Sequence, residues 1–238
     1  MYKSSKLILG LFFVALVATG CVKKADVKKA SEPIHHVAVV SLSVANWGGT
    51  MTGTSGSRAH AARLIDSTMS GMLSVTERKL GSVMRVTNAS SFVRNSGYRH
   101  LGVKNDLRAM VPKVHGTPMQ VFAKNNSELV AASLSPRVAK ELCADLHVQA
   151  VVVVYSEWSY SVGHFVPTKR ALAKNVVSVW DRKGNEIFHQ RVDMDGRGVL
   201  GGPIGPIVVN EGTIKQWEGA YIDGLDKIIP EMKKLTHA

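Results

Sequence analysis

Residues 150–155 read Ala-Val-Val-Val-Val-Tyr (AVVVVY) and are the most strand-like stretch of this 238-residue chain. An unbroken β-branched run between polar residues is typical of a strand that is covered on both faces of a sheet. We therefore expect residues 150–155 to lie at the centre of a sheet. Ser135 and Pro136 predict the start of a helix that runs to about Leu146 and leads into this strand, because Ser caps a helix and Pro fits its first position.

A β-hairpin is predicted after this strand. Residues 171–180 and 185–194 are rich in β-forming residues and flank the turn sequence Asp-Arg-Lys-Gly at 181–184, in which Gly184 would take a positive φ. Residues 198–206 (GVLGGPIGP) predict an irregular loop. The chain then predicts an amphipathic C-terminal helix, which Pro230 should kink or shorten. Its apolar face comprises Ile214, Trp217, Tyr221, Leu225, Ile228, Met232 and Leu235.

The first half of the chain predicts a second strand and helix. Residues 35–42 (HHVAVVSL) suit a buried strand, and residues 46–57 (NWGGTMTGTSGS) suit a long Gly-rich loop. Apolar residues at helical spacing predict a helix over 58–80, ended by Gly81. Residues 82–87 suit another strand, and residues 107–111 suit one or two helical turns.

Together these elements predict an α/β fold. We expect a single mixed-sheet domain over residues 35–238, flanked by helices, with a C-terminal β-hairpin and amphipathic helix. Hydrophobic residues make up 45% of the chain, which excludes a disordered protein.

The N-terminus carries the clearest functional signal. Lys3 and Lys6 precede an unbroken apolar run over residues 7–18 (LILGLFFVALVA). This run is too short to span a bilayer, which takes about 20 residues of helix, and its charged-then-apolar order is typical of a secretory signal. It ends in Ala-Thr-Gly-Cys at 18–21, which resembles the bacterial lipobox. The resemblance implies a signal peptide over residues 1–20, cleavage after Gly20, and acyl chains such as palmitate on Cys21.

The lipobox resemblance also implies a location. Val22 follows the cysteine, in place of the Asp associated with inner-membrane retention in enteric bacteria, so we expect a lipid anchor in the outer membrane, with the protein on its periplasmic face. Residues 21–34 are then predicted to form a lipidated N-terminus and a flexible, solvated tether, whose lysines add attraction to anionic head groups. The alternative is an ordinary signal or an uncleaved anchor, with Cys21 incidental.

Charge and cysteine content limit the partners. The 30 Lys and Arg exceed the 18 Asp and Glu, giving a formal net charge of +12. An exported protein is not expected to meet nucleic acid, so anionic envelope material or solubility is the simpler explanation of this charge. Cys143 has no second cysteine to pair with once Cys21 is lipidated, and its apolar neighbours predict a buried structural thiol.

No assembled catalytic set is visible in the sequence. The Gly-rich loop at 46–57 lacks both a Gly-Lys-Ser/Thr phosphate-binding motif and a G-x-S-x-G nucleophile motif. None of the nine histidines has metal-ligand spacing. The acids Glu157, Asp193 and Asp195 suit a solvated surface. We therefore expect no enzyme activity, no metal and no cofactor, and keep an envelope hydrolase built from distant residues as a less favoured alternative.

Three aromatic residues are candidates for contact with a partner protein. Trp158 and Tyr160 alternate with serines and so share one strand face. If exposed, the two rings suit a binding hot spot, and if buried they belong to the core. Trp47, beside the Gly-rich loop, has the same two interpretations, whereas the helical phase of Trp217 places it in the core.

The order of elements resembles the α/β domain of a group of envelope proteins that includes the curli-secretion lipoprotein CsgG, the penicillin-binding-protein activator LpoB and the TolB N-terminal domain. The likeness depends on residues 35–42 with the following loop and helix, and on residues 146–155 leading into 175–191 (NVVSVWDRKGNEIFHQR). Only the lipid site, Cys21, transfers from this resemblance.

These features predict a lipid-anchored, periplasm-facing binding or assembly module of the bacterial cell envelope, with an envelope protein or the cell wall as partner. The alternative is a subunit of an oligomeric outer-membrane secretion or appendage apparatus. In that case residues 46–57 or 157–170 would enter a ring or the membrane.

Overall fold

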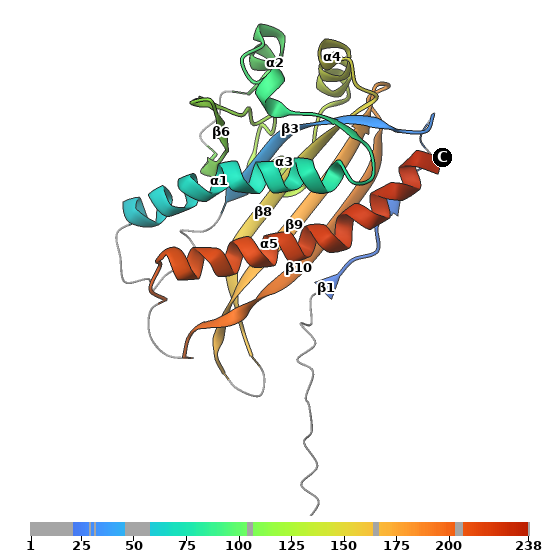
Figure 1. Ribbon diagram of the computed structural model, residues 1–238. Coiled ribbons are helices and arrows are strands. Elements are labelled where there is room, and N and C mark those ends of the chain that lie inside the picture. Colours follow the sequence, from blue (N-terminus) through green and yellow to red (C-terminus); the bar gives the residue numbers. More distant parts are fainter. Residues whose placement is uncertain are drawn as a thin grey trace, which may run out of the picture.

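The computed structural model describes residues 21–28, 30, 32–45, 58–103, 107–163, 167–202 and 207–237. These residues form a mixed sheet with helices on both of its faces (Figure 1). The predicted α/β class is therefore confirmed. The signal sequence over residues 1–20 and the Gly-rich loop over residues 46–57 lie outside the described part of the chain.

Three long antiparallel strands form the main part of the sheet: β8 (Ala150–Val162), β9 (Lys169–Asp181) and β10 (Glu186–Gly201). On the other side of β8, strand β3 (His36–Ala45) pairs in parallel. Because β8 has neighbours on both sides, the predicted central position of residues 150–155 is confirmed. Two short strands complete this side of the sheet, namely β4 (Arg85–Thr87) and β5 (Ala109–Met110), which both pair with β3.

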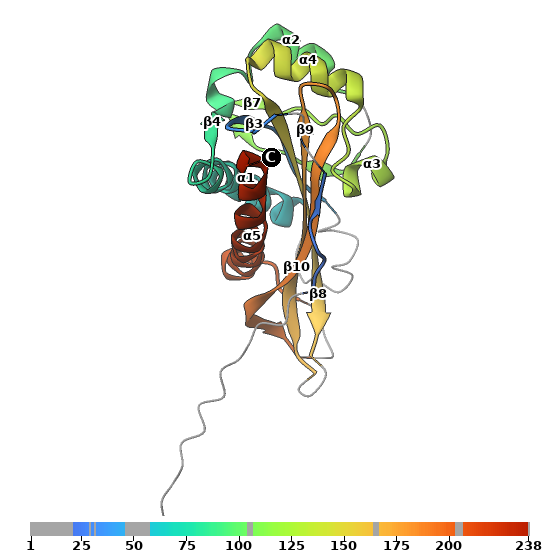
Figure 2. The same ribbon diagram turned by 90° about the vertical axis from the view of Figure 1, so that its right-hand side faces the viewer.

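Helices cover both faces of β8, which explains its valine content. The long helices α1 (Arg58–Leu80) and α5 (Glu211–Met232) lie on one face, and α3 (Asn126–Val130) lies on the other (Figure 2). The helix α4 (Pro136–Leu146) packs against β8 and β9. As a result Val151, Val152 and Val154 are all buried.

Local sequence signals set the ends of these elements. The Ser135 hydroxyl accepts a hydrogen bond from the Val138 N–H at 3.3 Å, as predicted for the start of α4. In the β9–β10 turn, Gly184 has φ of +80°, and a Cβ there would lie 2.5 Å from the Pro136 carbonyl oxygen. Pro230 lies inside α5, which changes two residues later into the 3₁₀ helix η2 (Lys233–His237).

Four short elements complete the described chain. They are η1 (Ala89–Ser91), α2 (Ser96–Leu101), β6 (Lys113–Val114) and β7 (Thr117–Pro118), of which β6 and β7 form a small hairpin. In the part of the chain that the structure describes, no helix is both long enough and apolar enough to cross a membrane.

Some sequence-based predictions of local structure are wrong. Residues 107–111 do not form helical turns, because Ala109 and Met110 pair with the end of β3 as strand β5. Residues 198–201 are not an irregular loop, since β10 continues to Gly201 opposite Lys169. Within residues 82–87 only 85–87 form a strand.

The described part of residues 21–34 is not a solvated tether, which corrects a second prediction. The strands β1 (Cys21–Val22) and β2 (Asp26–Val27) run antiparallel along the outer edge of β10. Farther along, Ala30 and Ile34 are buried, and the Ile34 N–H donates to the Leu235 carbonyl at 2.9 Å. The physical reason is that β10 would otherwise leave a row of backbone donors and acceptors unpaired.

Close packing between α5 and the sheet predicts opposite effects for two glycine substitutions on this helix. A Cβ at Gly224 would lie 2.1 Å from Nδ2 of Asn175, which is buried and accepts a hydrogen bond from the Ser156 hydroxyl at 2.7 Å. A Cβ at Gly219 would meet no atom within 4 Å. We expect Gly224→Ala to lower the free energy of unfolding by about 1–3 kcal/mol through overpacking. The matched control, Gly219→Ala, should raise it by about 0.5–1 kcal/mol.

Urea unfolding followed by circular dichroism measures both changes. Equal effects of the two alanines on the unfolding midpoint would contradict the packing of α5 against Asn175.

Candidate functional site

Strands β8, β9 and β10 extend beyond the pairing with β3. Among the described residues, this pairing ends where Ala45 lies opposite Glu157. Past this level the three strands continue together to the lower end of the molecule in Figure 1. We call this part the distal end and define it as residues 158–162, 169–173 and 195–201.

Two stacked tryptophans fix the base of the distal end. The rings of Trp158 on β8 and Trp217 on α5 are nearly parallel, at 8°, with their centroids 6.0 Å apart. The Trp217 Nε1–H donates to the Ser159 carbonyl at 2.6 Å. Both rings are fully buried, so Trp158 is a core residue and its predicted role in partner contact is wrong. The cause is α5, which covers the strand face that Trp158 occupies.

Tyr160 lies one pleat farther along β8 and is only half-buried. The ammonium group of Lys169 lies 5.5 Å from the centroid of its ring, which suits a cation–π contact. Tyr160 therefore stays a candidate for partner contact. Trp47, the third aromatic candidate, lies outside the residues that the structure describes.

Strand β10 bends where it meets α5. Its register with β9 shifts between Asp195 and Val199, which marks a bulge. Within the bulge, the Gly198 N–H donates to the Gln216 side-chain oxygen at 2.7 Å, and a Cβ at Gly198 would lie 2.9 Å from that side chain. A side chain at residue 198 would push the Gln216 amide aside, and this hydrogen bond holds the end of β10 against the first turns of α5.

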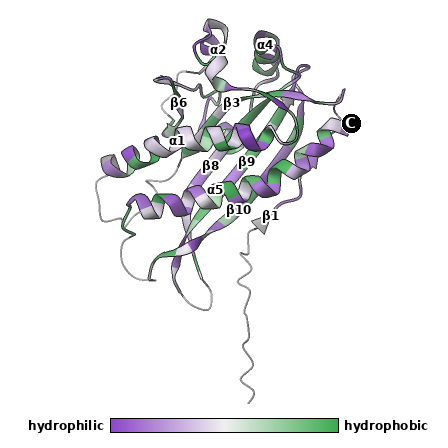
Figure 3. Cartoon of the chain, viewed as in Figure 1, coloured by the Kyte–Doolittle hydropathy of each residue, from purple (hydrophilic) through white to green (hydrophobic). Residues whose placement is uncertain are grey.

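Exposed hydrophobic residues occur at the distal end and in the segment that follows it. In the described part of the chain, three large hydrophobic residues are exposed: Val162 (47%), Val199 (56%) and Val208 (50%). Val162 ends β8, Val199 lies on β10, and Val208 lies two residues before Asn210, the N-cap of α5. Figure 3 shows hydrophobic residues continuing to the end of β10. Val162 shares a cross-strand row with Lys169, and Val199 shares the next row with Arg170, so the two valines belong to opposite faces of the distal end. Exposed apolar side chains on both faces of a strand end are typical of a segment that contacts a partner.

Positive charge accompanies these valines. Lys169 lies opposite Val162, and Arg170 lies opposite both Ser161 and Val199. The one acid of the distal end, Asp195, accepts a hydrogen bond from the Ser161 hydroxyl at 2.5 Å. An apolar surface with flanking cations suits a partner that is apolar and anionic, such as the head-group region of a bilayer.

The candidate lipid site lies beside a row of ion pairs. Glu157, Lys174 and Asp193 are cross-strand neighbours, and Cys21 of β1 pairs with Asp193 at the end of this row. Lys174 contacts Glu157 at 2.6 Å, and Arg191 binds both carboxylate oxygens of Asp193, at 2.8 and 2.9 Å. These carboxylates are partly buried and paired, which corrects the prediction of a solvated surface role.

The direction of β1 places Cys21 toward the distal end. Strand β10 runs from the β9–β10 turn to the distal end, and β1 runs antiparallel to it. Cys21 is therefore the residue of β1 nearest the distal end. If cleavage occurs after Gly20, the new N-terminus lies at this end of β1.

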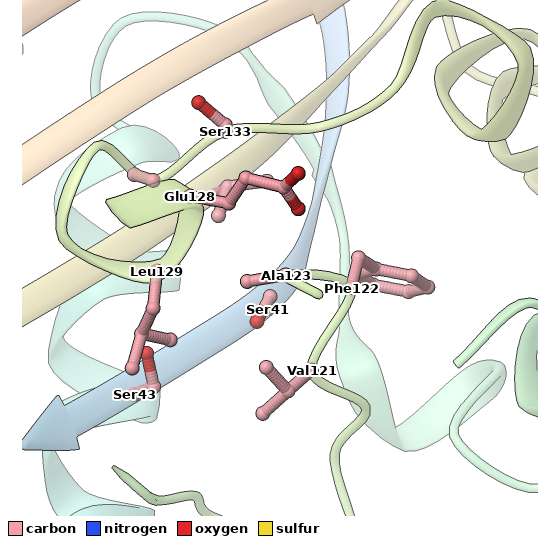
Figure 4. A pocket seen from close by; sticks show the side chains of 10 residues that line it. Ser41, Ser43, Val121, Phe122, Ala123, Glu128, Leu129 and Ser133 are labelled. Carbon is pink, nitrogen blue, oxygen red and sulfur yellow. The ribbon is translucent and has the colours of Figure 1, made fainter. Parts of the chain in front are cut away.

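The cavity shown in Figure 4 suits a structural role. Ser41 and Ser43 on β3 line it together with Leu129 of α3, and its volume is about 10 Å³. This space holds about one water molecule and is too small for an organic ligand. Glu128 at its border caps the turn before α3, because its carboxylate accepts the Lys124 N–H at 2.7 Å.

The described residues were also compared with the predictions for a reactive thiol and a metal site. Cys143 is buried, as predicted, and burial raises the pKa of its thiol to about 12, so it stays protonated at neutral pH. Among the described residues, no three His, Cys, Asp or Glu side chains come together as a metal site.

Comparison with known proteins leaves the chain without an assigned family. No family model and no curated protein matches it. Two solved structures of the PelC dodecamer from Paraburkholderia phytofirmans, one of them of a variant, each give a TM-score of 0.39 at 11% identity. They cover 92% of this chain, and 98% and 100% of their own. Similarity at this level supports no conclusion about fold or function. The resemblance to the CsgG, LpoB and TolB group stays a prediction.

Sequence reasoning missed the valines of the distal end. Val162 follows a strand pattern, and Val199 lies in a Gly-rich stretch that predicts a loop. Their exposure depends on where β3 and α5 stop covering the long strands. The one available signal was the apolar content of residues 199–208 between glycines and prolines.

The Trp158–Trp217 stack generates a stability prediction. Trp217→Phe removes the indole donor and leaves the buried Ser159 carbonyl without this partner, so the free energy of unfolding should fall by about 1–3 kcal/mol. Amide hydrogen exchange should accelerate in residues 158–162. The control is Trp180→Phe, since the half-buried Trp180 donates to the Ser178 hydroxyl far from the distal end.

Hydrogen exchange measured by mass spectrometry separates the two variants. Unchanged protection of residues 158–162 in Trp217→Phe would show that the stack does not hold the distal end in place.

Proposed function

We propose that this protein is a lipid-anchored, periplasm-facing binding or assembly module of the bacterial cell envelope, without enzymatic activity. Acyl chains on Cys21 hold it in the outer membrane. The observation that carries the proposal is the position of Cys21 on the edge of β10, at the end of β1 that faces the exposed valines. The lipobox-like sequence at 18–21 and the position of Cys21 at the sheet edge both support Cys21 as the lipid site.

The anchor and the distal end would act together. Each buried methylene contributes about 0.8 kcal/mol, so two or three acyl chains give stable attachment. Because residues 21–28 follow the edge of β10, the link between lipid and domain is short. Val162 lies five residues beyond Glu157 along β8, which corresponds to about 17 Å. A bilayer holding the acyl chains would face the β10 edge and the adjoining distal end.

The distal end would supply the contact with the membrane or with a membrane-bound envelope partner. Val162 and Val199 offer apolar surface, and Lys169 adds positive charge next to Tyr160. A Lys or Arg near an anionic bilayer contributes about 1 kcal/mol, and a fully buried valine contributes about 1.5 kcal/mol. These contributions would orient the protein on the membrane surface, where its acyl chains already hold it.

The second candidate function is a subunit of an oligomeric outer-membrane secretion or appendage apparatus. The same exposed valines support it, because they could pack against a neighbouring copy. Light scattering of the detergent-extracted protein decides between the two candidates. A monomeric mass at all concentrations would contradict the oligomeric apparatus and leave the binding module.

The lipid anchor is tested by Cys21→Ser. We expect this variant to lose incorporation of labelled palmitate and to leave the outer-membrane fraction, because its N-terminal segment can no longer carry acyl chains. Cys143→Ala is the matched control and should keep both properties, since its thiol is buried. Unchanged labelling and fractionation of Cys21→Ser would overturn the anchor.

The membrane contact is tested in the Cys21→Ser background, where no lipid masks weaker binding. We expect Val162→Asp with Val199→Asp to lower the affinity for vesicles of phosphatidylethanolamine and phosphatidylglycerol by about tenfold or more, because two apolar contacts are replaced by charges. The control pair, Ser74→Asp with Asn126→Asp, makes the same change in charge at exposed helical positions.

Vesicle sedimentation measures these affinities. Equal losses in both pairs would mean that net charge alone governs binding, and that the valines of the distal end do not contact the bilayer.

A further inference from the structure

A second concave surface lies at the end of the molecule opposite the distal end. It is a cleft of about 500 Å³ beside α2, at the top of Figure 1. The side chains that border it are mostly polar or cationic, namely Arg94, Ser96, Arg99, His100, Val103 and Gln120. None of the residues predicted from the sequence as a partner site belongs to it.

A buried tyrosine fixes the shape of this cleft. The Tyr98 hydroxyl donates to the Val40 carbonyl of β3 and accepts the Gln120 N–H, both at 2.8 Å. The Tyr98 ring makes edge-to-face contacts with Phe92 and Phe122 at 5.0 and 5.9 Å. Tyr98 therefore connects α2 to both β3 and the segment at Gln120, which fixes the spacing between two sides of the cleft.

The two arginines of the cleft have different neighbours. The Arg94 guanidinium donates to the His115 carbonyl at 2.9 Å, which ties it to the turn between β6 and β7. Arg99 and His100 are exposed, and no carboxylate among the described residues forms an ion pair with either of them. Asp145 of α4 approaches Gly97 but does not line the cleft. The positive charge of the cleft is therefore not neutralised by its own walls.

We propose that this cleft binds an anionic sugar, that is, a saccharide unit bearing a carboxylate or a phosphate. Guanidinium groups pair with carboxylate and phosphate in a planar, two-pronged geometry, which fits Arg99 and Arg94. The Ser96 hydroxyl and the Gln120 amide supply neutral donors and acceptors for sugar hydroxyls. The volume lies within the usual range of ligand sites, about 300–1,000 Å³.

The location favours a sugar over a lipid head group. Helix α2, which borders the cleft, lies at the opposite end of the molecule from the distal end (Figure 1). A bilayer that faced the distal end would not reach α2. The preference for a sugar rests on the membrane contact in the proposed function, whereas the cleft and its positive charge do not, so ligand binding can be tested separately from the anchor.

The test uses the full chain purified in detergent and isothermal titration calorimetry at low salt. Trigalacturonate is the anionic probe, and maltotriose is the neutral control of the same length. We expect saturable one-to-one binding of trigalacturonate, little binding of maltotriose, and an affinity that falls as salt rises. Arg99→Gln should weaken trigalacturonate binding about tenfold or more, and adding Arg94→Gln should abolish it.

Arg78→Gln is the matched control, because Arg78 is an exposed arginine in the last turn of α1 and its loss changes the net charge equally. It should bind trigalacturonate like the unmodified chain. Equal weakening in Arg78→Gln and Arg99→Gln, or equal binding of maltotriose, would overturn the proposal. If inorganic phosphate or phosphatidylglycerol vesicles compete as strongly as trigalacturonate, the specificity for sugar is overturned.

Urea unfolding of each variant shows whether a substitution weakens binding by destabilising the whole protein or by changing the cleft alone. The Arg99 side chain is exposed, so Arg99→Gln should leave the unfolding midpoint unchanged, and weaker binding then reports on the cleft. If Cys21→Ser keeps its palmitate label and its place in the outer-membrane fraction, the proposed anchor is wrong. The results expected from these titrations stay the same in that case.

Discussion

The first half of β8 can hold four successive valines, residues 151–154, because β3 and β9 together satisfy its backbone along residues 150–157. Such a strand cannot face water, so helices must cover both of its faces. α1 and α5 cover one face, and α3 covers the other. The sheet is covered where β8 pairs with β3. In the described part of the chain this pairing ends at Glu157, and the three strands that continue past it form the distal end.

The edge of β10 poses the complementary problem. An unpaired edge next to a twisted, buried sheet invites association, and in this protein residues 21–28 occupy it. The same segment begins with the cysteine that the sequence marks as the lipid site. In the proposed function, this one segment both protects the edge and places the anchor, which would hold the bilayer close to the sheet.

The two ends of the long strands have different chemistry. The distal end combines exposed valines with Lys169 and Arg170, whereas the cleft beside α2 combines arginines with neutral hydrogen-bonding groups. The first suits an interface between water and lipid, and the second suits a hydrated anionic ligand. Under the two proposals, the protein would hold an anionic sugar at one end and a membrane at the other.

Sequence alone determined the features that depend on near neighbours along the chain: the central strand at 150–155, the hairpin turn at Gly184, the cap at Ser135, and the lipobox-like stretch before Cys21. Periodicity also placed Trp158 and Tyr160 on one face, but not which of them α5 would cover. Tertiary structure decided that Trp158 stacks on Trp217, that residues 21–28 join the sheet, and that Arg94 and Arg99 border one cleft with Gln120. The reason is physical: turns and caps are set by local backbone geometry, whereas burial and the meeting of distant side chains depend on how the layers pack.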